Sequence, residues 1–258
     1  MNAVHTMFKT IKALVLREVR YKEADRILTL LSAEEGKLTV KARGALRKSS
    51  RTGAATQQLT YAEMTLFGNR GKWTVNEASV LEGFDGLRTD LEALALGSYF
   101  AECLEALSVE EQPDAELMQL GLNSLYALSR GLYDARLIKA AFEFRLMCLS
   151  GYAPDLSACA ACGGEPADPV FQPAEGRVYC RACPHGGGTL VLGPEALAAM
   201  RYLAAAPAKK LFSFSLGEEA AERLSLVAEQ YLLRQTERRF GTLEYYKQIR
   251  SSGFGIRN

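Results

Sequence analysis

Four of the six cysteines in this chain form two close pairs, Cys159 with Cys162 and Cys180 with Cys183. Each pair has the spacing C-x2-C, and 17 residues separate the two pairs. Thiolates at this spacing bind zinc in a zinc ribbon, where a hairpin carries the second pair back to the first. We therefore predict one zinc ion bound by these four cysteines. Four thiolates fill the tetrahedron and leave no position for water, so the predicted role is structural.

A second candidate site is the basic stretch Gly36–Arg51, GKLTVKARGALRKSSR, which carries six positive charges and no negative one. Its first half alternates as a strand does, with Leu38 and Val40 on one face and lysines on the other. From Gly44 onwards the alternation is lost, which predicts a flexible basic loop with nothing apolar to bury. Such a strand and loop could follow a nucleic-acid strand. The alternative is an edge strand kept soluble by its charges.

The charge distribution places the positive field in the N-terminal part. The net charge is only +1, but residues 1–80 carry 14 Lys and Arg against 7 Asp and Glu, and the remainder carries 17 against 23. A positive N-terminal domain suits a polyanionic partner. The sequence contains no apolar run long enough for a membrane span and no secretion signal, which predicts a cytoplasmic protein that does not bind membranes.

Residues for catalysis are scarce. The two histidines are His5 and His185, which leaves little material for a histidine relay. The segment Gly68–Lys72 lacks the spacing and the hydroxyl of a phosphate-binding loop. We predict that the protein is not an enzyme. A less favoured interpretation, a metal-dependent hydrolase, is weakened by the closed set of four cysteines and by the scarcity of histidines.

The N-terminal region has the period of strands. Five short strands within about 80 residues favour a small closed barrel, because closure removes exposed edges. An OB-like barrel is the leading prediction, and an SH3-like barrel fits the strand count almost as well. Aromatic residues here either fill the barrel or stack on bases, and Trp73 is the most attractive stacking platform. The predicted strands are Ile11–Arg20, Asp25–Ser32, Lys37–Gly44, Leu59–Phe67 and Lys72–Leu81.

After Gly86 the period becomes that of helices. Thr89 and Glu92 have the spacing of a capping box, and Asp114 and Asp134 can cap two further helices. Two more helical segments follow the cysteines and begin at Gly193 and Gly217. The predicted fold class is α+β, with an OB-fold barrel in residues 1–83, a helical domain in residues 84–258 and the zinc ribbon inserted at about residues 155–190.

Three motifs resemble those of the bacterial RecO family of recombination mediators. They are VLREVRYKEADRILTLLSAEEGKLTVKARGALRKSSR at residues 15–51, GYAPDLSACAACG at 151–163 and VYCRAC at 178–183. In the first, the spacing of Tyr21, Glu23 and Asp25 occurs together with the turn at Gly36 and the basic run at Ala42–Arg47. The arrangement of parts matches over essentially the whole chain, although residues 190–258 match by helical pattern more than by motif.

The resemblance implies a function in DNA repair. Members of the family bind single- and double-stranded DNA, anneal complementary strands and, with RecR, help load RecA on strands coated by single-strand-binding protein, whose acidic C-terminal tail they recognise. It also implies that the protein is located in the bacterial cytoplasm and associates with the nucleoid. The rival interpretation is a zinc-ribbon regulator of transcription or translation. The DNA-binding face of the family's barrel corresponds here to Lys37, Lys41, Arg43, Arg47, Lys48 and Arg51.

Overall fold

The computed structural model describes residues 7–252, which divide into two compact units. One unit holds the chain up to Arg130 together with the segment from Phe240 onwards, and the other holds Gly131–Arg239. The first unit thus contains the barrel and part of the helical region. The predicted division into residues 1–83 and 84–258 stays a prediction.

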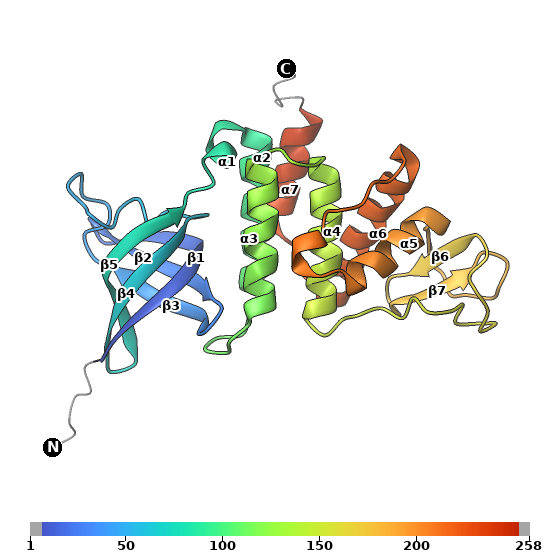
Figure 1. Cartoon of the computed structure of the whole chain (residues 1–258), viewed down its shortest axis with the longest axis horizontal. Coiled ribbons are helices and arrows are strands. Elements are labelled where there is room, and N and C mark those ends of the chain that lie inside the picture. The colour runs from blue at the N-terminus through green and yellow to red at the C-terminus, as the bar shows by residue number, and fades with distance from the viewer. Residues whose placement is uncertain (1–6, 253–258) are drawn as a thin grey trace. The chain divides into compact units, whose positions relative to one another are not determined.

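The first unit begins with a closed five-stranded barrel of order β1-β2-β3-β5-β4 (Figure 1). All strand pairs are antiparallel except β3 with β5, which pair in parallel at Val40 with Trp73 and Lys41 with Thr74. This crossover makes the barrel a Greek key of the OB type and decides against the SH3-like alternative. The strands are β1 (Met7–Tyr21), β2 (Asp25–Ser32), β3 (Gly36–Ala42), β4 (Tyr61–Asn69) and β5 (Lys72–Glu82).

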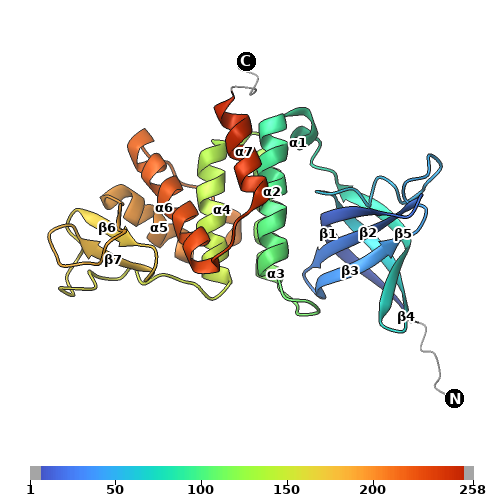
Figure 2. The ribbon, with the colours of Figure 1, turned by 180° about the vertical axis from the view of Figure 1, so that it is seen from behind.

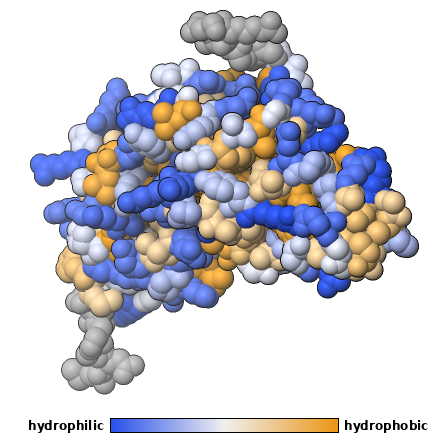
Figure 3. Space-filling view, turned by 45° about the vertical axis from the view of Figure 1, so that its right-hand side comes forward, coloured by the Kyte–Doolittle hydropathy of each residue, from blue (hydrophilic) through white to orange (hydrophobic). Residues whose placement is uncertain are grey.

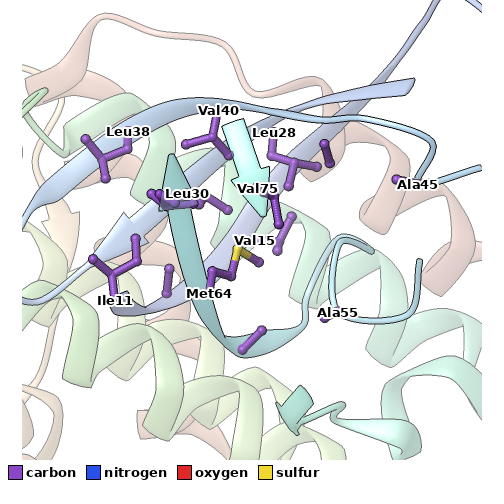
Figure 4. Close-up of a cluster of buried hydrophobic side chains, with 14 residues drawn as sticks. Ile11, Val15, Leu28, Leu30, Leu38, Val40, Ala45, Ala55, Met64 and Val75 are labelled. Carbon is purple, nitrogen blue, oxygen red and sulfur yellow. The ribbon is translucent and has the colours of Figure 1, made fainter. Parts of the chain in front are cut away.

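Alternate residues of the strands fill the barrel, as the period of two predicts. Leu28 and Leu30 of β2, Val40 of β3 and Met64 of β4 are fully or almost fully buried there (Figure 4). Ala45 also belongs to this cluster although it lies in the segment between β3 and β4. The interpretation that the basic loop has nothing apolar to bury is therefore wrong.

Four helices complete the first unit. They are α1 (Asp85–Thr89), α2 (Leu91–Leu107), α3 (Ala115–Ser129) and α7 (Gly241–Ser251). Helices α2 and α7 lie side by side, although more than 130 residues separate them (Figure 2). The predicted cap of α2 is wrong, since the carboxylate of Asp90, and not Thr89, accepts hydrogen bonds from the amides of Glu92 and Ala93. Asp114 caps α3 as predicted.

The second unit contains three α-helices, a short 3-10 turn and a small sheet. The elements are α4 (Ala135–Leu149), β6 (Pro169–Gln172), β7 (Arg177–Cys180), β8 (Leu190–Val191), α5 (Pro194–Ala205), η1 (Ala208–Lys210) and α6 (Glu218–Thr236). Helix α4 packs against both α5 and α6. The three strands form a sheet of order β7-β6-β8, inserted between α4 and α5. The predicted α+β fold with an inserted ribbon is confirmed.

A buried ion-pair cluster joins α4 to α6. The ammonium group of Lys139 lies 2.7 Å from a carboxylate oxygen of Glu143 and 2.8 Å from one of Glu229. Burial alone would lower the pKa of Lys139, but the two carboxylates outweigh it and raise that pKa. The cluster therefore fixes α6 against α4 with charges that are compensated inside the unit.

The surface carries both polar and hydrophobic side chains. Figure 3 shows polar side chains over much of the face it presents, interrupted by smaller hydrophobic areas. Within residues 7–252, none of the helices combines the length and the hydropathy that a membrane crossing requires.

Candidate metal centre and nucleic-acid interface

The four predicted cysteine ligands meet in the ribbon. Their sulfur atoms all lie within 4.8 Å of one another, and the sulfurs of Cys162 and Cys180 are 3.9 Å apart. A tetrahedron with metal–sulfur bonds of about 2.3 Å has sulfurs about 3.8 Å apart, whereas a disulfide holds its sulfurs at about 2 Å. The spacing thus fits four thiolates around one metal ion. The cysteines are positioned to bind a metal, as the sequence predicts.

Backbone amides donate hydrogen bonds to two of the sulfurs, and such bonds favour the thiolate form. The amide of Cys180 donates to the sulfur of Cys159 at 3.2 Å, and the amide of Ala167 donates to the sulfur of Cys180 at 3.3 Å. The amide of Cys180 lowers the pKa of the Cys159 thiol to about 6. In contrast, the hydrogen bond with Cys162 raises the pKa of Cys183 to about 12. Neighbouring thiolates repel one another, and a divalent metal would supply the positive charge that offsets this repulsion.

The ribbon is held by side chains of neighbouring helices in the same unit. Arg201 of α5 donates to the carbonyl of Leu156 at 2.9 Å and pairs with Glu165 at 2.7 Å. On the other side, the hydroxyl of Tyr231 in α6 donates to the carbonyl of Tyr152 at 2.7 Å. These contacts fix the segments before and after the first cysteine pair. The ribbon is therefore tied to both α5 and α6.

His185 lies outside this centre. The Nδ1 atom of His185 lies 3.2 Å from the carbonyl of Gly186 and 3.5 Å from the hydroxyl of Thr189. The metal-binding cluster found among the described residues consists of the four cysteines alone. His5 lies outside the described residues.

The second candidate site is a groove of about 630 Å³ on the outer face of the barrel. Its walls come from β2, β3 and β5, from the ends of β1 and β4 and from the turn between β4 and β5. In OB folds, oligonucleotides bind on the face of the second and third strands. They also contact the loop between the first and second strands and the loop between the fourth and fifth. The aromatic and basic residues that line the groove are Tyr21, Lys41, Arg43, Phe67, Lys72 and Trp73.

Two of the six predicted DNA-binding residues, Lys41 and Arg43, line this groove. Lys37 is placed differently, because its ammonium group donates to the carbonyl of Glu105 in α2 at 3.0 Å. Three further residues, Arg47, Lys48 and Arg51, lie exposed on the segment that follows β3. Five of the six cations thus either line the groove or lie exposed on the segment after β3.

The segment that follows β3, residues 43–60, is folded onto the barrel. The amide of Leu46 donates to the carbonyl of Ala24 at 2.9 Å, and the guanidinium of Arg26 donates to the carbonyl of Gly53 at 2.9 Å. Arg26 also reaches the hydroxyl of Thr56 at 3.0 Å. We call residues 43–60 the basic loop. These contacts give it a defined path along the barrel.

The aromatic residues of the groove differ in how far they are buried. The ring of Trp73 packs against the barrel core and over Gly68, where an added Cβ would lie 2.6 Å from the ring. The ammonium group of Lys9 lies 4.1 Å from the centre of the indole ring and 2.5 Å from a carboxylate oxygen of Glu35. Trp73 thus closes the barrel and shows only part of its surface to the groove, which makes it a poorer stacking platform than its sequence position suggests.

The more exposed ring of the groove is Tyr21, 43% of whose surface is accessible. The ammonium group of Lys41 lies 4.8 Å from its centre. Tyr21 and Lys72 were not among the predicted binding residues. Their signal in the sequence is position, since each flanks a turn that an OB fold uses for binding.

Comparison with known proteins covers nearly the whole chain. Residues 7–84 match the family model described as Recombination protein O N terminal, and residues 88–244 match that described as Recombination protein O C terminal. The first match coincides with the barrel, and the second includes the ribbon and the helices up to α7.

Three relatives are described as DNA repair protein RecO. That of Acetivibrio thermocellus is 34% identical over 92% of this chain and 95% of its own length. That of Symbiobacterium thermophilum is 33% identical over 94% of this chain and 98% of its own. That of Desulforudis audaxviator is 40% identical over 67% of this chain and 69% of its own. The similarity therefore includes both the barrel and the helical region.

Proposed function

Since the chain belongs to the RecO family of DNA repair proteins, we propose that it is a recombination mediator that binds DNA on its barrel and anneals complementary strands. The observation that supports this most is the groove, where Lys41, Arg43 and Lys72 stand beside Tyr21 and Phe67 on the binding face of an OB fold. Cations beside aromatic rings suit a single strand, because phosphates and bases then find separate partners.

Annealing on such a surface needs no bond chemistry. Two DNA strands repel each other, and a cationic surface lowers this repulsion while base edges remain free to pair. The proposal therefore describes a protein that is not an enzyme. Its experiment is the annealing of complementary strands coated with single-strand-binding protein. We expect the chain to accelerate annealing, and a rate equal to that without the protein would contradict the proposal.

The proposed partners follow from the family. They are single- and double-stranded DNA, RecR, the acidic C-terminal tail of single-strand-binding protein and, indirectly, RecA. The place of action would be the nucleoid in the bacterial cytoplasm. The alternative, a regulator of transcription or translation, is not favoured, because both matching family descriptions name recombination. A regulator should also prefer particular sequences and should not anneal strands.

We assign the cysteine centre to one structural zinc ion. Four thiolates at tetrahedral spacing fit zinc and leave no open position for a substrate. Bound there, the ion would supply folding energy to a small module whose sheet has short strands. Its contribution to DNA binding would thus be indirect, through the fold of the second unit.

Tyr21 provides a specific test of base stacking. Replacing Tyr21 with Ala should reduce the affinity for single-stranded DNA by about 1–3 kcal/mol, which is the range for a base on an aromatic ring. Replacing it with Phe should preserve the affinity, because the ring remains. Fluorescence anisotropy of a labelled oligonucleotide measures both. Equal affinities for the Ala variant and the unmodified protein would exclude stacking on this ring.

A further inference from the structure

One acidic residue stands at the rim of the basic groove. Asp25, the first residue of β2, accepts the ammonium group of Lys41 at 2.9 Å through one carboxylate oxygen. Its other oxygen accepts the amide of Gly44 at 2.8 Å. Asp25 therefore binds both the last lysine of β3 and the first turn of the basic loop.

Gly44 makes this second contact from an unusual backbone conformation. Its φ is +64°, in the left-handed region that favours glycine. The chain turns here from β3 into the basic loop, and the next backbone contact, from Leu46 to Ala24, follows two residues later. The first residue of β2 and the residue before it thus hold the start of the basic loop at two points.

The same carboxylate determines the surroundings of Lys41. The lysine side chain is 26% exposed, and its ammonium group lies beside the ring of Tyr21 as well as beside Asp25. An ammonium group has three donors, so one bond to Asp25 leaves others for a phosphate. The amide of Gly44 and then Lys41 lower the pKa of Asp25, so the carboxylate stays charged at neutral pH.

Two opposite effects on DNA binding are possible for such a carboxylate. A negative charge near a phosphate path repels DNA, and its removal should then strengthen binding. A carboxylate that holds a lysine and a loop in place reduces the conformational entropy lost on binding, and its removal should then weaken binding. The contacts of Asp25 favour the second effect, because both of its oxygens are used inside the barrel domain.

We propose that Asp25 is a positioning residue of the DNA groove, which holds Lys41 beside Tyr21 and fixes the turn from which the basic loop begins. This inference rests on the proposed DNA-binding function. DNA does not contact Asp25 itself in this account, and the ion pair with Lys41 persists in the complex.

The experiment measures single-stranded DNA affinity by anisotropy for Asp25→Ala, Asp25→Asn and Glu23→Ala. Asp25→Ala removes the charge and both acceptors, and should weaken binding about tenfold if one long side chain and one loop are no longer held. Asp25→Asn removes the same charge but keeps an oxygen for the amide of Gly44, and should lie between Asp25→Ala and the unmodified protein. Glu23→Ala removes an exposed negative charge two residues away and should leave the affinity unchanged or slightly higher.

If Asp25 acted only through its negative charge, the DNA affinities of the variants would follow a different order. If Asp25→Ala and Asp25→Asn both bind DNA more tightly than the unmodified protein, and to the same extent, the inference is wrong. Hydrogen exchange gives a second readout, since the amides of Gly44 and Leu46 should exchange faster in Asp25→Ala than in Asp25→Asn. Should Asp25→Ala fail to fold, the Asn variant decides, because weaker binding supports the inference and tighter binding overturns it.

Arg43→Glu separates this inference from the proposed function. Arg43 lines the groove, so its reversal should weaken binding whatever Asp25 does. Weaker binding by Arg43→Glu together with tighter binding by both Asp25 variants would overturn the proposed role of Asp25. It would leave the groove as the DNA site. Unchanged binding by Arg43→Glu would instead contradict the groove as the DNA site.

Discussion

Reversing the charges of Arg43, Arg47 and Lys48 to Glu should weaken single-stranded DNA binding about 100-fold at roughly 0.1 M salt. Each phosphate contact on a single strand contributes about −0.7 to the slope of log affinity against log salt. Loss of three contacts should therefore reduce the magnitude of that slope by about 2, and annealing should be abolished. Anisotropy titrations at several salt concentrations measure both quantities.

A charge reversal outside the groove provides the control. Lys12 is exposed on β1 and pairs across the sheet with Glu63 of β4, away from the lining of the groove. Lys12→Glu should change the affinity much less than Arg43→Glu, although both substitutions alter the net charge equally. Far-UV circular dichroism of each variant checks that the barrel remains folded. An unchanged salt slope in the triple variant would refute the assignment of these residues.

Replacing Cys159 or Cys180 with Ser should release the metal and unfold the ribbon. Both sulfurs accept backbone amides and belong to the buried cluster of the ribbon, so a serine removes a ligand and a packed atom together. Binding of zinc contributes about 10–16 kcal/mol in small zinc modules, which exceeds the total stability of many domains. Elemental analysis should find one zinc per chain in the unmodified protein and none in the variants.

Cys148→Ser is the matched control for that experiment. Cys148 lies in α4 outside the cluster, and burial raises the pKa of its thiol to about 11, so it is an unreactive thiol rather than a ligand. This variant should keep its metal. Hydrogen exchange should show loss of protection in β6 and β7 of the two ligand variants but not in Cys148→Ser. Absence of metal from the unmodified protein would contradict the assignment.

The elements could be predicted from sequence because their patterns are local. Alternating residues placed all five strands, and Asp114 and Asp134 were correct helix caps. The cysteine centre was equally accessible, since C-x2-C pairs place their sulfurs through short local turns. Thr89 was a wrong cap because Asp90, one residue later, offered a carboxylate to the same amides.

The parts of the groove were harder to predict because they depend on contacts distant in sequence. Lys37 and Lys41 share one face of β3, yet Lys37 meets the carbonyl of Glu105 and Lys41 meets Asp25. Only the folded chain brings these partners close. Trp73 illustrates the same limit. Its ring packs over Gly68 and beside the ammonium group of Lys9, and neither residue is adjacent to Trp73 in the sequence.

Fluorescence of Trp73 during a DNA titration tests whether DNA binds in the barrel groove. Trp73 is the only tryptophan of the chain, and it lines the groove. Unlabelled oligothymidylate should change its emission in a saturable way, with the same midpoint as anisotropy of labelled DNA, because DNA in the groove changes the surroundings of the part of the indole that lines it. The triple variant should show no change at those concentrations. Binding by anisotropy with constant Trp73 emission would place the DNA elsewhere and contradict the account.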